Sequence, residues 1–260
     1  MVKHFPNILT LCNLFCGCVA TAYILHSSPF LMAHGDQDAE YWVNGMGSFY
    51  WGAILIIVAG IFDVLDGAVA RMLGVESPIG KDLDSLADVV SFGVAPSAIL
   101  FKLLWAAHMK DPHAMDVNVA VACPAFILAC FGALRLARFN NAAKNNDAFT
   151  GTPIPSVGIA VAGLGLAAYF QPFTIGTALQ NVWVLYAIII VGSALMVSNI
   201  SCFSIKMKSF DFAQNWGRYL WLALSIVAIV VFKYLGIPIA FILYVLISLF
   251  YKPQTSTIKN

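Results

Sequence analysis

The sequence predicts an all-α integral membrane protein, a polytopic helical bundle of about eight transmembrane helices in one domain over residues 1–260. Composition is the first observation, because 60% of the residues are apolar and only 10% are charged, whereas soluble domains carry about 25% charged residues. The second is that apolar runs of about 20 residues, the length that crosses a bilayer as a helix, recur along the chain. The net charge of +1 says nothing about nucleic acid, and no basic run indicates it, so we expect no nucleic-acid partner.

Each predicted span has limits that the sequence justifies. The first runs directly into a polar loop without a small-residue cleavage pattern, so we expect it to remain as a membrane helix. The second is apolar over 49–62 and ends among acidic residues, where the third begins. The fifth follows a proline-containing segment, 151–155, and proline is well tolerated where a helix starts. The predicted spans are 8–26, 48–70, 84–106, 118–137, 154–171, 180–202, 216–233 and 237–251.

The basic residues predict the orientation of the bundle. Connections 27–47 and 171–181 contain no Lys or Arg. By the positive-inside rule, the other connections and both termini are then cytoplasmic. Lys102, Lys110 and Lys233 are the exceptions. The residues assigned to the cytoplasmic side are Lys3, Arg71, Lys81, Arg135, Arg138, Lys144, Lys206, Lys208, Arg218, Lys252 and Lys259.

Acidic residues concentrate in one window at this predicted cytoplasmic edge. Six of the 13 Asp and Glu residues lie within 63–88. A carboxylate in a membrane helix costs roughly 2.5–3.5 kcal/mol at the helix centre, so such residues usually serve a function. The six are Asp63, Asp66, Glu76, Asp82, Asp84 and Asp88.

Four of these carboxylates form two pairs that can share one site. Asp63 and Asp66 are three residues apart, and Asp84 and Asp88 are four apart, so each pair lies on one helix face. We expect the first pair to end the second helix, the second pair to begin the third, and a connection of about a dozen residues to bring them together. Oxygen ligands alone suit Mg²⁺, Mn²⁺ or Ca²⁺, and two such ions would neutralise four carboxylates.

The residues around the pairs fit a phosphate-bearing ligand. Gly67 and Gly80 leave room for it beside the backbone, Ala70 keeps the same helix face open, and Arg71 offers a planar fork for phosphate. The alternative from another class is a cation-coupled or proton-coupled transporter, which also places acidic residues in membrane helices. A transporter would spread them along a path through the bilayer, whereas these four cluster at one edge.

The complete spacing is Asp-x-x-Asp-Gly-x-x-Ala-Arg, eight residues, then Gly-x-x-x-Asp-x-x-x-Asp. This string resembles the signature of the CDP-alcohol phosphatidyltransferase family at all eight positions, and segment 6–10 resembles the family's entry to its first helix. Segments 84–96, 135–140 and 149–155 resemble the phosphatidylserine synthase branch. The resemblance implies a six-helix core, here 1–202, followed by a peripheral C-terminal hairpin within 203–260.

The resemblance also implies the reaction and the roles of the residues. A phosphatidyl group would pass from CDP-diacylglycerol to L-serine, with release of CMP. Two divalent cations would be required, Mg²⁺ or Mn²⁺, with Ca²⁺ as the alternative. Asp63, Asp66 and Asp84 would hold one ion and Asp63, Asp84 and Asp88 the other, with Asp88 as general base. The residues expected to contact CDP-diacylglycerol are Asn7, Thr10, Gly67, Ala70, Arg71, Ser77 and Gly80.

The acceptor is the least constrained part of this prediction. The carboxylate of serine needs a cation, for which Arg135 and Arg138 are the candidates, although both also suit plain interfacial anchors. Glycerol 3-phosphate, inositol phosphate or choline remain alternative acceptors. We expect a homodimer in a bacterial cytoplasmic membrane, with its active site facing the cytoplasm.

Overall fold

The computed structural model describes residues 5–27, 30–33, 41–44, 47–75, 78–109, 118–145, 151–170, 178–200, 202–203 and 212–251. Its elements, in chain order, are α1 (Phe5–His26), β1 (Phe30–Ala33), β2 (Tyr41–Asn44), α2 (Gly47–Leu73), α3 (Pro78–Asp88), the π-helical turn η2 (Val89–Val94), α4 (Ala95–His108), the 3₁₀ turns η4 (Val119–Val121) and η5 (Cys123–Phe126), α5 (Ile127–Asn145), α6 (Ile154–Phe170), α8 (Val182–Val197), α9 (Phe212–Phe232), the 3₁₀ turn η7 (Lys233–Leu235) and α10 (Gly236–Phe250).

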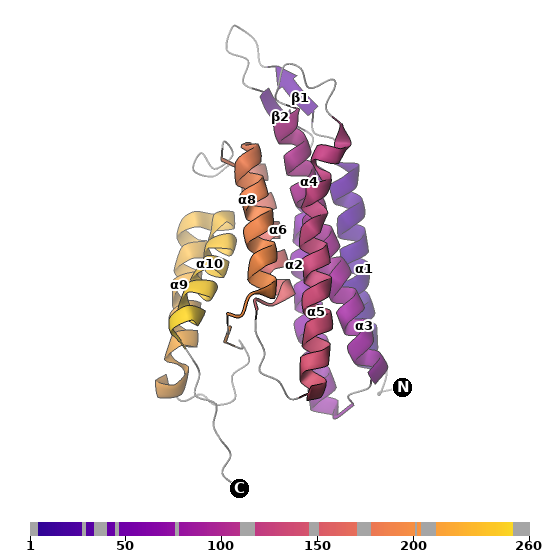
Figure 1. The fold of residues 1–260 in the computed structure, drawn as a ribbon, viewed down its shortest axis with the longest axis vertical. Helices are drawn as coiled ribbons and strands as arrows, with labels where there is room; N and C mark the ends of the chain where they lie inside the picture. The colour runs from indigo at the N-terminus through magenta and orange to yellow at the C-terminus, as the bar shows by residue number, and fades with distance from the viewer. Residues whose placement is uncertain are drawn as a thin grey trace.

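Helices form at all eight predicted spans, which confirms the all-helical bundle (Figure 1). The strands β1 and β2, which the sequence analysis did not predict, form a short antiparallel pair between α1 and α2. Two of the helices, α6 and α8, are apolar but shorter than a full span, so the count of eight transmembrane helices stays a prediction. Five stretches are long and apolar enough to span a membrane: Phe5–His26, Ser48–Leu73, Pro78–His108, Val119–Asn141 and Asn215–Phe250.

The last of these stretches is a hairpin. α9 and α10 lie side by side at one edge of the bundle (Figure 1). The turn η7 connects them, and the indole Nε1 of Trp221 on α9 donates to the carbonyl of Ala240 on α10 over 3.0 Å. Phe203, 1% exposed, packs between their aromatic rings and accepts a 2.8 Å hydrogen bond at its carbonyl from the Tyr244 hydroxyl. The hairpin is thereby attached to the segment that follows α8.

The turn between α2 and α3 is shorter than the sequence analysis predicted. α2 continues to Leu73 and α3 begins at Pro78, so both aspartate pairs lie within helices rather than at their ends. Gly74 ends α2 in the left-handed region, with φ of 63°, a conformation that glycine adopts without strain. The amide of Val75 donates to the carbonyl of Ala70 over 3.1 Å, which satisfies the helix terminus. Only four residues therefore separate α2 from α3, and both helices pack against α1.

The third predicted span is one continuous helix with a change of pitch. α3 passes into the π-helical turn η2 directly after Asp88, and the amide of Ala95 donates to the carbonyl of Val90, five residues earlier. π-helical turns inside α-helices are often found at functional sites. Here the turn lies where the helix approaches α1 closely, since a Cβ on Gly17 would lie 2.7 Å from the Cα of Ser91.

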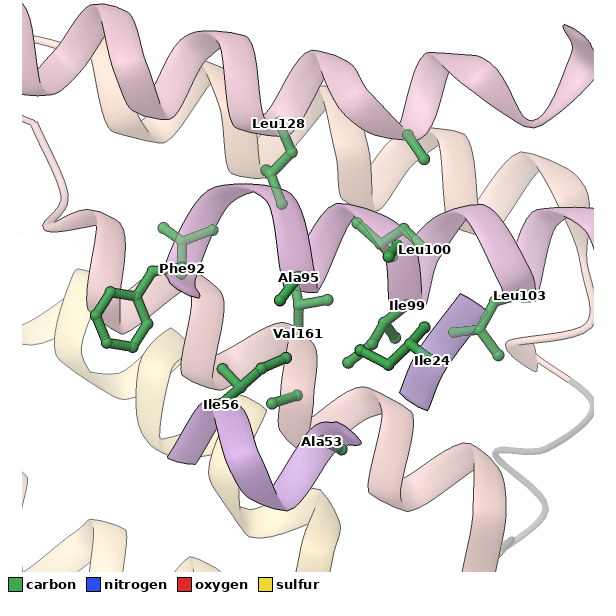
Figure 2. Close-up of a cluster of buried hydrophobic side chains, with 14 of the residues drawn as sticks. Ile24, Ala53, Ile56, Phe92, Ala95, Ile99, Leu100, Leu103, Leu128 and Val161 are labelled. Atoms are coloured by element: carbon green, nitrogen blue, oxygen red, sulfur yellow. The ribbon is translucent and has the colours of Figure 1, made fainter. Parts of the chain in front are cut away.

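An apolar core joins the helices that carry the acidic residues to their neighbours. Figure 2 shows Ile24 of α1, Ile56 of α2, Phe92 of η2, Leu128 of α5 and Val161 of α6 converging, each at most 3% exposed. Small residues such as Ala53 and Ala95 allow the helices to approach closely, which is the main source of packing energy between helices in lipid. This core fixes α1, α2 and the third span relative to one another.

The fold also accounts for one of the three basic residues that depart from the charge pattern. The Nζ of Lys102 on α4 donates to the carbonyl of Ser27 over 2.7 Å, at the C-terminal end of α1. Cations are favourable there because the last carbonyls of a helix have no partner within it. Lys102 is thus a helix cap, and Lys110 lies outside the described residues.

Candidate active site

Three aspartates from α2 and α3 lie close together. One carboxylate oxygen from each of Asp63, Asp66 and Asp84 lies within 4.8 Å of the others. Asp66 is buried, at 5% exposed, while Asp63 and Asp84 are half-buried. The predicted convergence of the two pairs is confirmed for these three residues.

Asp88 lies one turn beyond Asp84 and faces the same group. It is 6% exposed and interacts electrostatically with Asp63, Asp84 and Asp66. The side-chain amide of Asn13 on α1 reaches its Oδ1, with Nδ2 at 3.5 Å. Asp88 thus interacts with the other three carboxylates and also contacts Asn13 on α1.

This acidic group fits a divalent cation in its donor chemistry. Like charges this close repel one another unless protons or cations lie among them. All of the converging ligand atoms are carboxylate oxygens, which suit Mg²⁺, Mn²⁺ or Ca²⁺ rather than softer metals. Asp63, Asp66 and Asp84 are therefore the residues that could hold such an ion together.

The first helix contributes two polar side chains to this group. The hydroxyl of Thr10 lies 2.7 Å from Oδ2 of Asp66 and 3.1 Å from the carbonyl of Pro6. Thr10 was expected to contact CDP-diacylglycerol, and the structure places it on a carboxylate. The sequence analysis did not predict a role for Asn13. A signal was available: Asn13 follows Thr10 by three residues, on the same helix face, and both are polar residues in an apolar run.

The expected nucleotide contacts lie along α2 and α3 with different exposure. Arg71 is exposed and Ala70 and Gly80 are half-buried. A Cβ added to Gly67 would meet nothing nearer than Nη1 of Arg71, at 3.4 Å, so this face of α2 is open. Asn7 is half-buried in the first turn of α1, and Ser77 lies outside the described residues.

The two candidate arginines for the acceptor are separated by the fold. Arg135 on α5 is 7% exposed and interacts electrostatically with Asp88, whereas Arg138 is exposed. The Phe139 ring has the Arg135 guanidinium and the Lys81 ammonium each 5.8 Å from its centre. The structure thus places Arg135, and not Arg138, next to the acidic group.

A hydrogen bond ties α5 to α3 beside the same residues. The side-chain amide of Asn140 donates to the hydroxyl of Ser85 over 2.9 Å. Ser85 follows Asp84 directly, so this contact holds the acidic turn of α3 against the helix that carries Arg135.

Comparison with known sequences decides which family has this arrangement. The sequence profile of the CDP-alcohol phosphatidyltransferase family matches residues 3–180, a range that includes all four aspartates, α1 and Arg135. The chain belongs to the CDP-alcohol phosphatidyltransferase family. It is therefore a transferase of phospholipid biosynthesis, carried on apolar helices typical of an integral membrane protein.

Three relatives match between 59% and 75% of this chain. The CDP-diacylglycerol–serine O-phosphatidyltransferase of Helicobacter pylori is 32% identical over 198 residues, covering 75% of this chain and 70% of the relative. That of Bacillus subtilis is 32% identical over 161 residues, covering 62% and 74%. The archaetidylserine synthase of Methanothermobacter thermautotrophicus is 34% identical over 159 residues, covering 59% and 58%. The names of all three relatives include serine.

Proposed function

We propose that this protein transfers the phosphatidyl group of CDP-diacylglycerol to the hydroxyl of L-serine, forming phosphatidylserine and CMP. The observation that carries the proposal is the group of Asp63, Asp66 and Asp84 oxygens within 4.8 Å, with Asp88 beside them. The names of the relatives support serine as the acceptor.

The proposal assigns the metal ligands by residue. Asp63, Asp66 and Asp84 hold one divalent cation, and Asp63, Asp84 and Asp88 hold a second. The preferred ions are Mg²⁺ or Mn²⁺, and Ca²⁺ has the same ligand chemistry. When bound, such ions offset the charge of the pyrophosphate and of the departing CMP. The face beside Gly67 is open and can admit a phosphate-bearing group, and the exposed fork of Arg71 can bind it.

Asp88 is proposed to accept the proton of the serine hydroxyl. The hydroxyl oxygen bonds to the phosphorus of the phosphatidyl group, the bond from phosphorus to the CMP oxygen breaks, and CMP leaves with the electron pair. A carboxylate is a weak base towards an alcohol, so the proton moves as the new bond forms. The placement of Asp88 supports this role, since it is buried beside the other three carboxylates.

Arg135 is proposed to bind the carboxylate of serine. We expect Arg135→Ala to raise the serine KM by roughly 10- to 100-fold, because a hydrogen bond to a charged group contributes about 1.5–3 kcal/mol. Arg138→Ala is the matched control, one turn away on the same helix but exposed, and we expect it to leave the serine KM near the wild-type value. Steady-state kinetics at saturating CDP-diacylglycerol measure both. A serine KM that is unchanged in Arg135→Ala would rule out this assignment.

We further propose how the protein lies in the membrane, how it is divided and how it assembles. The protein spans a bacterial cytoplasmic membrane eight times, with both termini and the aspartates at the cytoplasmic face. Residues 1–202 form the catalytic core and 203–260 the C-terminal hairpin, and the protein is a homodimer. The strand pair at one end of the bundle and the α2–α3 turn at the other support opposite faces for these two connections (Figure 1).

The deciding experiment measures CMP release from CDP-diacylglycerol by the purified protein. We expect release that requires L-serine, is abolished by EDTA and returns with Mg²⁺ or Mn²⁺. Glycerol 3-phosphate, inositol phosphate and choline serve as parallel acceptors. Release with one of these and none with serine would replace the acceptor but keep the site, whereas no release with any acceptor would contradict the proposal.

A further inference from the structure

Two residues on one face of α1 hold two of the four aspartates. Thr10 and Asn13 are three residues apart and are 4% and 0% exposed. Their side chains contact carboxylates on two other helices, Asp66 on α2 at 2.7 Å and Asp88 on α3 at 3.5 Å. A single helix thereby reaches both aspartate pairs at once.

The position of α1 is itself set by a close backbone contact. The hydroxyl of Ser91, in the π-helical turn, donates to the carbonyl of Asn13 over 2.9 Å. One turn further along α1, a Cβ on Gly17 would lie 2.3 Å from the Ser91 hydroxyl oxygen, so only glycine admits this approach. Asn13 is therefore anchored through its own backbone to the helix that carries Asp88.

The side-chain oxygen of Asn13 is a hydrogen-bond acceptor beside the acidic group. Its Oδ1 is buried and has no hydrogen-bond partner among the described residues. A buried acceptor without a partner costs free energy unless a ligand or water supplies a donor. A bound, hydrated ligand beside Asp88 would relieve that cost.

We propose that Thr10 and Asn13 are positioning residues that orient Asp66 and Asp88 for a divalent cation. A donor fixed on a neighbouring helix restricts the rotation of a carboxylate and leaves its second oxygen directed elsewhere. Hydrogen-bonding partners of metal ligands typically change metal affinity or activity by about 10- to 100-fold when they are removed. The inference rests on the metal assignment of the proposed function and gives Thr10 a role other than contact with CDP-diacylglycerol.

The test measures Mn²⁺ binding to the purified protein without substrate, by electron paramagnetic resonance of the free ion. Thr10→Val removes the donor at nearly constant volume, and Asn13→Leu does the same at Asn13. The matched control is Thr21→Val, because Thr21 on the same helix donates over 2.9 Å to the carbonyl of Gly17 and contacts no aspartate in the described structure. Thr10→Ser is the conservative variant, because it removes the methyl group and keeps the hydroxyl.

We expect Mn²⁺ to bind roughly tenfold more weakly to Thr10→Val and Asn13→Leu, and with wild-type affinity to Thr21→Val and Thr10→Ser. A purely structural role for Thr10 would lower the thermal midpoint without changing Mn²⁺ affinity, and that result would overturn the inference. Wild-type affinity in both Thr10→Val and Asn13→Leu would also overturn it while leaving the proposed function intact. If the wild-type protein bound no Mn²⁺, the metal assignment would fail and the inference with it.

Discussion

Replacement of Asp84 by Asn is expected to reduce phosphatidyl transfer by roughly a thousandfold. Asp84 belongs to both proposed ligand sets, and its carboxylate lies within 4.8 Å of those of Asp63 and Asp66. Bound cations contribute several kcal/mol to the stabilisation of charge at phosphorus, and each 1.4 kcal/mol corresponds to about tenfold in rate. CMP release at saturating Mn²⁺ and serine measures the loss.

The same variant separates loss of function from loss of folding. Asn is nearly isosteric with Asp and carries no charge, so Asp84→Asn relieves repulsion among the remaining carboxylates. In EDTA we expect its thermal midpoint to rise by roughly 2–4 °C, and the stabilisation by Mn²⁺ to shrink. Asp82→Asn is the matched control, an exposed aspartate on the same helix, and should keep wild-type activity. Retained transfer in Asp84→Asn would refute its role as a ligand.

Asp88→Asn is expected to lower kcat by roughly 10²- to 10⁴-fold, the usual contribution of a general base. The variant keeps an oxygen and the contact with Asn13 but loses the ability to take a proton. We therefore expect the KM for serine and the KM for CDP-diacylglycerol to change far less than kcat. Single-turnover CMP release with preloaded CDP-diacylglycerol measures the chemical step directly.

Two outcomes would contradict the role proposed for Asp88. Near wild-type single-turnover rates in Asp88→Asn would show that another group takes the proton. A large increase in the KM for CDP-diacylglycerol with little change in kcat would make Asp88 a binding residue only. Comparison with Asp84→Asn is informative, because Asp84 has no proposed part in proton transfer.

The convergence of the aspartates could be predicted from the sequence because it depends on local geometry. Spacings of three and four residues place Asp63 with Asp66 and Asp84 with Asp88 on one face of any α-helix. A short connection keeps the two consecutive helices near each other, and both pack against α1. The ends of those helices were predicted poorly, since helices continue beyond the apolar segment into the polar interface, and hydropathy alone does not mark where they stop.

The difference between Arg135 and Arg138 could not be read from the sequence. In a soluble helix, the polar face would show which side is buried. A membrane helix is apolar towards lipid and towards its neighbours alike, so residues one turn apart on α5 carry no mark of the side that they face. Arg135 is buried and interacts electrostatically with Asp88, Tyr244 and Cys202, which meet only in the folded bundle, whereas Arg138 is exposed.

The sequence by itself determined the membrane-helical class, the family and the four aspartates, because these follow from composition and from spacings within one or two turns. Only the tertiary structure decided which residues support those aspartates. Thr10 lies 56 residues from Asp66 and Asn13 lies 75 from Asp88, and each pair is joined by helix packing rather than by spacing. Gly17 allows α1 to approach the π-helical turn closely, and this contact could not be predicted from sequence periodicity. The approach positions α1 so that Thr10 and Asn13 contact the aspartates.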